Sequence, residues 1–218
     1  MNSSESAQHS TSNRTELPVV LAITGASGVI YGCRLLQLLL ESGIEVHLTI
    51  SESGRLVLLH ELGLEVDIKQ FRLDQILPDP EPAIAQAAES LLHYHHYQDF
   101  MTPIASGSHR TRAMVVCPCS GSTLSGIATA AGKNLIQRAA DVHMKERRPL
   151  ILVPRETPLS LIQIQNMQQV ANAGGTIMPA SPGFYHGCET VDDLVNFVVA
   201  RIADHLDVPH DLMKRWGS

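Results

Sequence analysis

The feature that most constrains this fold is a continuous apolar run, Pro18-Val-Val-Leu-Ala-Ile-Thr24, near the start of the chain. A strand that is apolar at every position has both faces buried, as in a parallel sheet with helices on either side. The loop Gly25-Ala-Ser-Gly28 follows, and a helical pattern at 29–42 places its leucines on one stripe. The run therefore predicts a buried strand that passes through a short loop into a helix.

The same alternation of strand and helix continues along the chain. It predicts an α/β fold, flavodoxin-like or Rossmann-like, whose doubly wound, mostly parallel sheet is the middle of three α/β/α layers. In such folds ligands bind beyond the carboxyl ends of the strands, where the strand order reverses. We expect strands at 18–24, 45–50, 66–71, 113–117, 149–153 and 176–178, and helices at 29–42, 53–62, 83–92, 123–130, 135–145, 159–173 and 191–206.

Length and composition indicate the domain organisation. Residues 1–17 are polar and aperiodic, so we expect a disordered tail, and residues 18–218 fit a single domain. The 218-residue chain has a formal net charge of −6 and 4% aromatic residues, which argues against a nucleic-acid partner. No apolar run approaches the roughly 20 residues of a membrane span. The four cysteines show no disulfide spacing, so we expect a cytoplasmic protein.

Small and polar residues gather at three predicted strand ends: Thr24-Gly-Ala-Ser-Gly28, Ser51 and Cys117-Pro-Cys-Ser-Gly-Ser-Thr123. Glycine allows a ligand close to the backbone, and a helix start offers free N–H groups, so we expect a phosphate in this crevice. The first loop lacks the spacing of a dinucleotide fingerprint and the lysine of a P-loop, which favours a mononucleotide such as FMN. An ordinary glycine-rich turn fits that loop equally well.

Basic side chains cluster in an otherwise acidic chain. Residues 145–148 fit a solvated helix end whose cations complement the helix dipole. Arg155 directly follows a predicted strand, where a parallel sheet presents functional groups, and we expect Glu156 to hold its guanidinium. The cluster, within eighteen positions, is Arg138, Lys145, Arg147, Arg148 and Arg155.

A fourth strand end carries aromatic residues. Pro182-Gly-Phe-Tyr-His186 follows the last short strand, and Arg201 lies on the final helix. A ring with a hydroxyl beside a cation suits a pocket for a small apolar group with an anionic end. A surface turn with Tyr185 packed inward is the alternative.

Two apparent metal motifs lack the set of about four ligands that a zinc site needs. Cys117-Pro-Cys119 fits two small residues buried beside the sheet, and His93-Tyr-His-His96 fits an exposed loop. Asp192-Asp193 fits a helix start, where the dipole favours acids. We expect no metal site.

Together these motifs resemble the flavin prenyltransferase family, UbiX and the related Pad proteins. The resemblance extends from Val19 to the C-terminus and is weakest at 65–100. One departure is Ser51-Glu-Ser53, where relatives often have Ser-Lys-Ala. The matching stretches are Ile23-Thr-Gly-Ala-Ser-Gly-Val-Ile-Tyr-Gly32, Cys117-Pro-Cys-Ser120, Arg138-Ala-Ala-Asp141, Lys145-Glu-Arg-Arg-Pro-Leu150, Val153-Pro-Arg-Glu-Thr-Pro158, Pro182-Gly-Phe-Tyr-His186 and Arg215-Trp216.

The resemblance implies transfer of a dimethylallyl group from dimethylallyl phosphate to reduced FMN, at N5 and then at C6. The product, prenylated FMN, is the cofactor of a UbiD-type decarboxylase, often in ubiquinone biosynthesis. Motif matching implies contacts to FMN from Gly25, Ala26, Ser27, Ser51, Ser120, Gly121, Ser122, Thr123 and Arg155. It implies contacts to dimethylallyl phosphate from Arg138, Lys145 (from a neighbouring subunit), Tyr185 and Arg201, and catalytic positions at Ser27, Glu61, Lys145, Glu156 and Tyr185.

The family forms trimers packed into dodecamers, so the resemblance implies the same homo-oligomer. Lys145, Arg155 and Arg201 are preorganised cations for a leaving phosphate, which predicts metal-independent transfer. One alternative is an FMN-dependent cysteine decarboxylase, whose motif Pro-Ala-Ser-Ala-Asn-Thr is replaced here by Pro118-Cys-Ser-Gly-Ser-Thr123. Another is a flavin carrier without catalysis. The sequence leaves open which decarboxylase uses the product, and whether a diphosphate is the donor.

Overall fold

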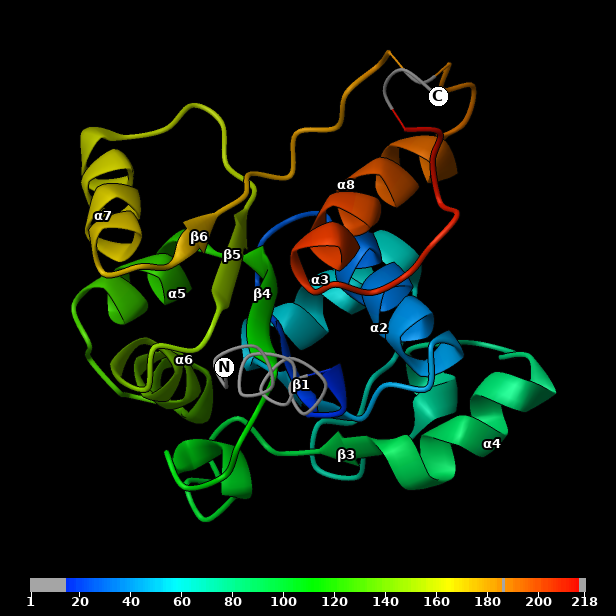
Figure 1. Cartoon of the computed structure of the whole chain (residues 1–218), viewed down its shortest axis with the longest axis horizontal. Helices are drawn as coiled ribbons and strands as arrows, with labels where there is room; N and C mark the ends of the chain where they lie inside the picture. Colours follow the sequence, from blue (N-terminus) through cyan, green and yellow to red (C-terminus); the bar gives the residue numbers. More distant parts are fainter. Residues whose placement is uncertain (1–14, 186, 216–218) are drawn as a thin grey trace, which may run out of the picture.

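A computed structural model describes residues 15–185 and 187–215 (Figure 1). Most of the predicted tail, residues 1–14, lies outside the described residues, as do His186 and Trp216 of the matched motifs. Within the described part of the chain, no helix is long and apolar enough to cross a membrane.

One parallel sheet organises the described residues. Every paired strand runs parallel to its neighbour, and the strand order is β3-β2-β1-β4-β5-β6. This is the doubly wound order, which reverses between β1 and β4, so the predicted fold class is confirmed. The strands are β1 (Val19–Ile23), β2 (Val46–Ile50), β3 (Leu92–Tyr94), β4 (Ala113–Cys119), β5 (Leu150–Pro154) and β6 (Thr176–Ile177).

The two faces of β1 are covered by two groups of helices (Figure 1). Val19, Leu21 and Ile23 belong to the core on one side, and Val20 and Ala22 to the core on the other. All five residues are fully buried, which explains the unbroken apolar run. Helices α2 (Val29–Glu41), α3 (Glu52–Leu62), α4 (Pro82–Leu91) and α8 (Val191–His205) pack around one another on the first side, and α5 (Gly121–Ala128), α6 (Leu135–Lys145) and α7 (Leu161–Asn172) on the second.

The predicted strand at 66–71 is wrong, and the sheet is completed by β3 instead. Val66 and Ile68 are buried between exposed neighbours, so their period of two imitates a strand. The Asp67 carboxylate, however, accepts the amides of Lys69 (2.8 Å) and Gln70 (3.1 Å), which turns the chain. The segment packs on the sheet edge through Tyr94, whose hydroxyl donates to the Ile68 carbonyl at 3.0 Å.

The histidine-rich segment 93–96 is partly strand rather than an exposed loop. His93 pairs with the buried His47 across the β2–β3 register, and the His95 ring stacks on His47, with 2.7 Å between their nitrogens. His109 packs edge-on against the same ring, and the Glu45 carboxylate lies 3.3 Å from His47 and from His93. Among the described residues, no group of three or more His, Cys, Asp or Glu side chains is arranged to hold a metal ion.

A second buried histidine, His143, ties α6 to the segment before β4. Its Nδ1 donates to the Ala139 carbonyl (2.7 Å), and its Nε2 accepts from the Thr111 hydroxyl (2.8 Å). Burial lowers the pKa of His143 to about 4. Burial and the neighbouring histidines lower the pKa of His47 to about 3. Both imidazoles are therefore neutral in the folded protein at neutral pH.

These buried histidines predict loss of stability in acid. Below a pH of about 6.5 the unfolded chain binds protons that the folded chain excludes, so the free energy of unfolding falls as the pH drops toward about 4. Each histidine contributes at most about 1.4 kcal/mol per pH unit. Denaturant titrations at several pH values measure the slope, which His143→Gln should reduce. Parallel curves for this variant and the natural chain would contradict the assignment.

Candidate active site

The carboxyl ends of β1 and β4 lie side by side where the strand order reverses, and Thr24 joins them. Its buried hydroxyl donates to the Pro118 carbonyl at 2.7 Å and accepts from the Ser120 amide at 2.8 Å. The Thr24 side chain, together with its own amide on the Pro118 carbonyl at 3.3 Å, therefore joins the two strand ends predicted to form one site. Sequence reasoning did not select Thr24, although a hydroxyl that ends an apolar strand is a signal for such a role.

The loop after β1 packs tightly against α3 and contacts Arg155. A Cβ on Gly25 would collide with the Ser53 side chain, so only glycine fits there. The Ser27 carbonyl accepts from Nε of Arg155 at 3.3 Å. The structure thus brings Ser27 and Arg155 together from the ends of β1 and β5, as the sequence predicted for one crevice.

The start of α2 is already satisfied by a carboxylate. Glu61, from the last turn of α3, accepts the amides of Gly28 (2.9 Å) and Val29 (3.4 Å). Gly28 adopts a positive φ of 93° as the N-cap. The Glu61 carboxylate supplies the negative charge that the helix dipole favours, so in this structure these two amides are taken up by Glu61.

The start of α5 has the free donors that α2 lacks. Ser120 caps the helix by accepting the Thr123 amide at 3.3 Å, and its hydroxyl lies 3.2 Å from that of Ser122 and 3.0 Å from that of Thr123. The first N–H groups of a helix have no carbonyl one turn earlier, so those of Gly121 and Ser122 face outward without intrahelical acceptors. Three hydroxyls and two free amides at a positive helix end suit a phosphate.

Ser51, at the end of β2, serves as the N-cap of α3. Its hydroxyl accepts the Gly54 amide at 3.0 Å, and its own amide donates to the Ile23 carbonyl at 3.0 Å. The adjacent Glu52 forms a surface ion pair with Arg55 at 2.6 Å. The acid that departs from the family pattern is therefore neutralised within α3.

Glu156 contacts α7 rather than its neighbour Arg155. Its carboxylate accepts from the Gln163 side chain (3.2 Å) and from the Thr157 amide (3.2 Å). Among the described residues it makes no ion pair with Arg155, so the expected support of that guanidinium is wrong. Gln163 also lies against Gly121, where a Cβ would be 3.1 Å from its side-chain nitrogen. Sequence reasoning missed Gln163, because only tertiary packing brings α7 to the α5 loop.

Tyr185 and Arg201 approach the same aromatic ring. The Tyr185 ring packs edge-on against Phe197, with 5.6 Å between centroids, and remains 53% exposed. Arg201 follows Phe197 by one helical turn, lines a pocket of about 220 Å³ with it, and forms an ion pair with Asp204 at 2.7 Å. A larger cleft of about 610 Å³ lies between α2 and the 76–84 segment and is lined by none of the predicted site residues.

Arg138 and Lys145 lie on α6, which leads into the amino end of β5. The loops after β1, β4 and β5 lie at the opposite, carboxyl ends of the strands. A single chain therefore does not bring Lys145 to these loops. Arg138 donates to the Ala105 carbonyl at 3.0 Å and forms an ion pair with Asp141 at 2.9 Å. The Lys145 ammonium lies 2.9 Å from the Glu146 carboxylate.

The cysteines near the site are structural. Cys33, Cys117 and Cys119 are buried and free. Burial raises the pKa of the Cys33 and Cys119 thiols to about 12, and it raises the pKa of Cys117 as well. A thiol with such a pKa is a weak nucleophile near neutral pH, which confirms their interpretation as small core residues.

Replacement of the Thr24 hydroxyl tests the junction between β1 and β4. Thr24→Val keeps the shape of the buried side chain but leaves the Ser120 amide and the Pro118 carbonyl without the Thr24 hydroxyl, so we expect a loss of about 1–3 kcal/mol in the free energy of unfolding. Thr49→Val is the matched control, because the buried Thr49 hydroxyl has no partner among the described residues. Chemical denaturation measures both. An equal effect of the two substitutions would contradict the role of Thr24.

Comparison with known proteins identifies the family. The Flavoprotein family matches residues 6–203. The flavin prenyltransferase UbiX of Pseudomonas aeruginosa is 48% identical over 200 residues, which cover 92% of this chain and 94% of that protein. The solved structure of AnUbiX in complex with FMN and dimethylallyl pyrophosphate is 34% identical with a TM-score of 0.79, and covers 93% of this chain and 98% of its own.

A dodecameric FMN-dependent UbiX-like decarboxylase from Escherichia coli O157:H7 is 37% identical with a TM-score of 0.78, over 93% of this chain and 100% of its own. The FMN-dependent cysteine decarboxylase SpaF is only 11% identical, with a TM-score of 0.54 over 76% of this chain and 85% of its own, so it shares the fold alone. The identity to UbiX over nearly the whole length favours a flavin prenyltransferase over an FMN-dependent cysteine decarboxylase. This chain belongs to the flavin prenyltransferase family of flavoproteins.

Proposed function

We propose that this chain transfers a dimethylallyl group from dimethylallyl phosphate to reduced FMN. The allylic C–O bond breaks and phosphate leaves as C1 of the prenyl group bonds to N5, which loses its proton. The remaining double bond is then protonated at C2 of the prenyl group, C3 bonds to C6, and the C6 proton is lost. The observation that carries the proposal is a pair of contacts at the strand ends around the point where the strand order reverses, Ser27 with Arg155 and Ser120 with Thr123. Because the chain belongs to the flavin prenyltransferases, we assign these residues to prenyl transfer.

The FMN phosphate fits the start of α5. The amides of Gly121 and Ser122 and the hydroxyls of Ser120, Ser122 and Thr123 are its donors, while the start of α2 is satisfied by Glu61. Gly25, Ala26, Ser27, Ser51 and Arg155 then surround the remainder of the flavin, which supplies the nucleophilic N5 and C6. Arg155, anchored to the Ser27 carbonyl, keeps guanidinium N–H groups free for this ligand.

The leaving phosphate needs positive charge as the allylic bond breaks. Tyr185 packs against Phe197, and Arg201 lines a pocket with the same ring, so the three suit a small apolar group with a phosphate at one end. Arg138 and Lys145 add two cations, so we propose that they enter the site from a neighbouring copy of the chain. Preorganised cations stabilise the developing anion without reorganisation during the reaction.

Several finer assignments belong to the same proposal. A trimer-based dodecamer gives each crevice a neighbour that carries Arg138 and Lys145. The product is delivered to a UbiD-type decarboxylase, in the cytoplasm. Residues 18–218 form the catalytic domain, preceded by the tail at 1–17. The monophosphate is our preferred donor because it needs less neutralisation than a diphosphate.

Anaerobic incubation with dithionite-reduced FMN and dimethylallyl phosphate, followed by mass spectrometry of the released flavin, tests the proposed reaction. We expect a flavin heavier by one prenyl unit. Arg155→Ala should weaken FMN binding about tenfold to a hundredfold, because hydrogen bonds to charged groups contribute about 1.5–3 kcal/mol. Tyr185→Phe should slow prenyl transfer at least about tenfold, whereas Tyr97→Phe, far from Phe197 in the chain, should not.

The alternatives predict other outcomes in that experiment. Unmodified FMN, tightly bound to an assembled oligomer, would favour a flavin carrier. Release of carbon dioxide from a peptide with a C-terminal cysteine would favour the cysteine decarboxylase. Either result from the natural chain would overturn the proposed prenyl transfer.

Glu61 is proposed to assist loss of the C6 proton with Ser27. Glu61→Gln keeps an oxygen for the Gly28 amide, so the start of α2 is preserved and FMN should still bind. The variant removes the base, and we expect the second bond-forming phase to slow by about 10²–10⁴ while the first is unchanged. Rapid-mixing spectroscopy separates the two phases. If both phases keep their natural rates, Glu61 acts only as a helix cap.

A further inference from the structure

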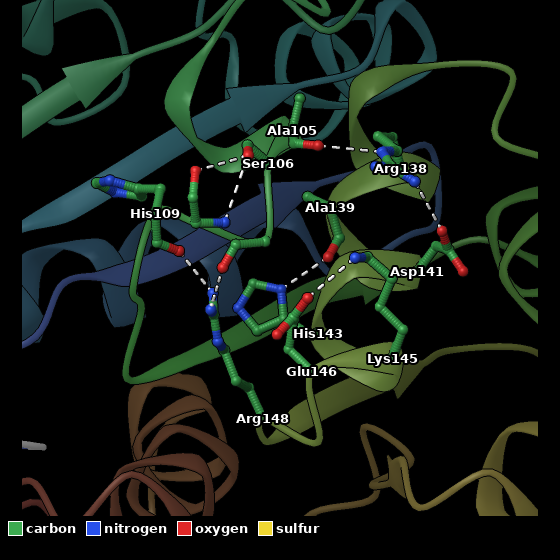
Figure 2. Close-up of polar contacts among 12 residues, drawn as sticks. Ala105, Ser106, His109, Arg138, Ala139, Asp141, His143, Lys145, Glu146 and Arg148 are labelled. Carbon is green, nitrogen blue, oxygen red and sulfur yellow. Dashed lines mark hydrogen bonds and ion pairs between the residues drawn. The ribbon is translucent and has the colours of Figure 1, made fainter.

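A tight turn at 103–109, before β4, contacts the cationic residues of α6 (Figure 2). It begins with the short helix η2 (Pro103–Ala105), continues through Ser106, whose hydroxyl lies 2.8 Å from that of Ser108, and ends at His109. None of the residues of the turn belongs to a motif matched above. The turn nevertheless contacts Arg138 and lies beside Lys145, two residues proposed to bind the substrate phosphate.

Arg148 holds the end of this turn. One terminal nitrogen of its guanidinium donates to the His109 carbonyl at 2.6 Å, and the other donates to the Gly107 carbonyl at 2.5 Å. The planar guanidinium holds two donor nitrogens in a fixed fork across the two carbonyls, a geometry that the compact ammonium of lysine does not reproduce. Arg148 is only partly exposed, so the expectation that 145–148 is simply a solvated helix end is wrong at this position.

The start of the turn holds Arg138. Its Nε donates to the Ala105 carbonyl at 3.0 Å, and a terminal nitrogen contacts the Asp141 carboxylate at 2.9 Å (Figure 2). The guanidinium is thus fixed on one edge by the turn and on another by its own helix. Because the guanidinium is already held in place, Arg138 loses less side-chain entropy on substrate binding than a freely rotating arginine would.

The middle of the turn sets the place of Lys145. Gly107 lies directly under the ion pair of Lys145 and Glu146: a Cβ there would collide with the Glu146 carboxylate and lie 3.2 Å from the Lys145 ammonium. The Lys145 partner holds the pKa of Glu146 below its usual range, so the carboxylate stays charged and keeps the ammonium at this spot.

We propose that the turn at 103–109 positions the phosphate-binding cations Arg138 and Lys145, and that Arg148 is the positioning residue that holds the turn in place. This inference rests on the proposed function, since it assigns the two cations to the phosphate of the dimethylallyl donor. Arg148 itself does not touch the substrate. Its effect is on how tightly the donor binds, through the geometry of its two neighbours on α6.

A charge-conserving pair of substitutions tests the inference. Arg148→Lys keeps the charge but removes the fixed fork that contacts two carbonyls, whereas Arg147→Lys changes an exposed neighbour whose side chain makes no hydrogen bond or ion pair with the turn among the described residues. Binding of dimethylallyl phosphate is titrated into assembled protein loaded with oxidised FMN. We expect Arg148→Lys to raise the Kd of the donor, and its KM in turnover, about tenfold. The Kd of FMN and kcat should stay within about twofold of the natural values, and Arg147→Lys should change none of them.

A second pair guards against a variant that simply loses its fold. Gly107→Ala displaces the flexible end of Glu146 and leaves the carbonyls that Arg148 contacts in place. Ser108→Ala removes a hydroxyl of the same turn whose hydrogen-bond partner, within the described part of the chain, is Ser106. We expect weaker donor binding only for Gly107→Ala. Equal donor Kd values across both pairs would overturn the inference, as would a parallel loss of FMN binding in Arg148→Lys.

Failure of the proposed function gives a different pattern. If the natural chain produces no prenylated flavin, the reaction is wrong, whatever the variants do. If it does produce prenylated flavin but Arg148→Lys binds the donor as tightly as Arg147→Lys, only the positioning role is wrong.

Discussion

The structure depends on a hydroxyl at the end of the central strand. Thr24 is fully buried directly after β1. Its hydroxyl donates to the Pro118 carbonyl near the end of β4 and accepts from the amide of Ser120, which follows β4. The strand order reverses at this point, so the loops on either side diverge and leave a crevice. Without the Thr24 contacts nothing else among the described side chains would tie the β1 loop to the capping serine of α5.

The N-termini of α2 and α5 differ in which groups balance the positive end of the helix dipole. Both α2 and α5 present the positive end of a dipole, but Glu61 neutralises α2 from within the chain. The start of α5 is left with hydroxyls and amides for an external anion. The remaining cations lie in two places. Arg155 contacts the loop after β1, at the carboxyl ends of the strands. Arg138 and Lys145 lie on α6, next to the turn before β4. The site that we propose therefore takes Arg138 and Lys145 from a second copy of the chain.

Much of the fold and part of the site could be predicted from the sequence. The buried strands and most of their helices could be predicted because apolar runs and caps act locally. The strand-end residues Ser27, Ser120 and Arg155 could be predicted because the carboxyl ends of parallel strands lie at the same end of the sheet. The error at 66–71 arose because a turn packed on the sheet edge alternates burial as a strand does. The Glu156 partner was wrong because Gln163 reaches it from α7. Neither arrangement has a local sequence signal.

The sequence by itself determined the layer architecture, the family, and the residue types available for phosphate and flavin. These follow from hydrophobic period and from short motifs, whose members lie within a few positions of one another. Only the tertiary structure decided which donors are free, that Glu61 occupies one helix start, and that Arg148 supports Arg138 and Lys145 through a turn forty residues earlier. Such assignments depend on hydrogen-bond partners distant in the chain, and the direction of a side chain is set by packing rather than by its own position in the sequence.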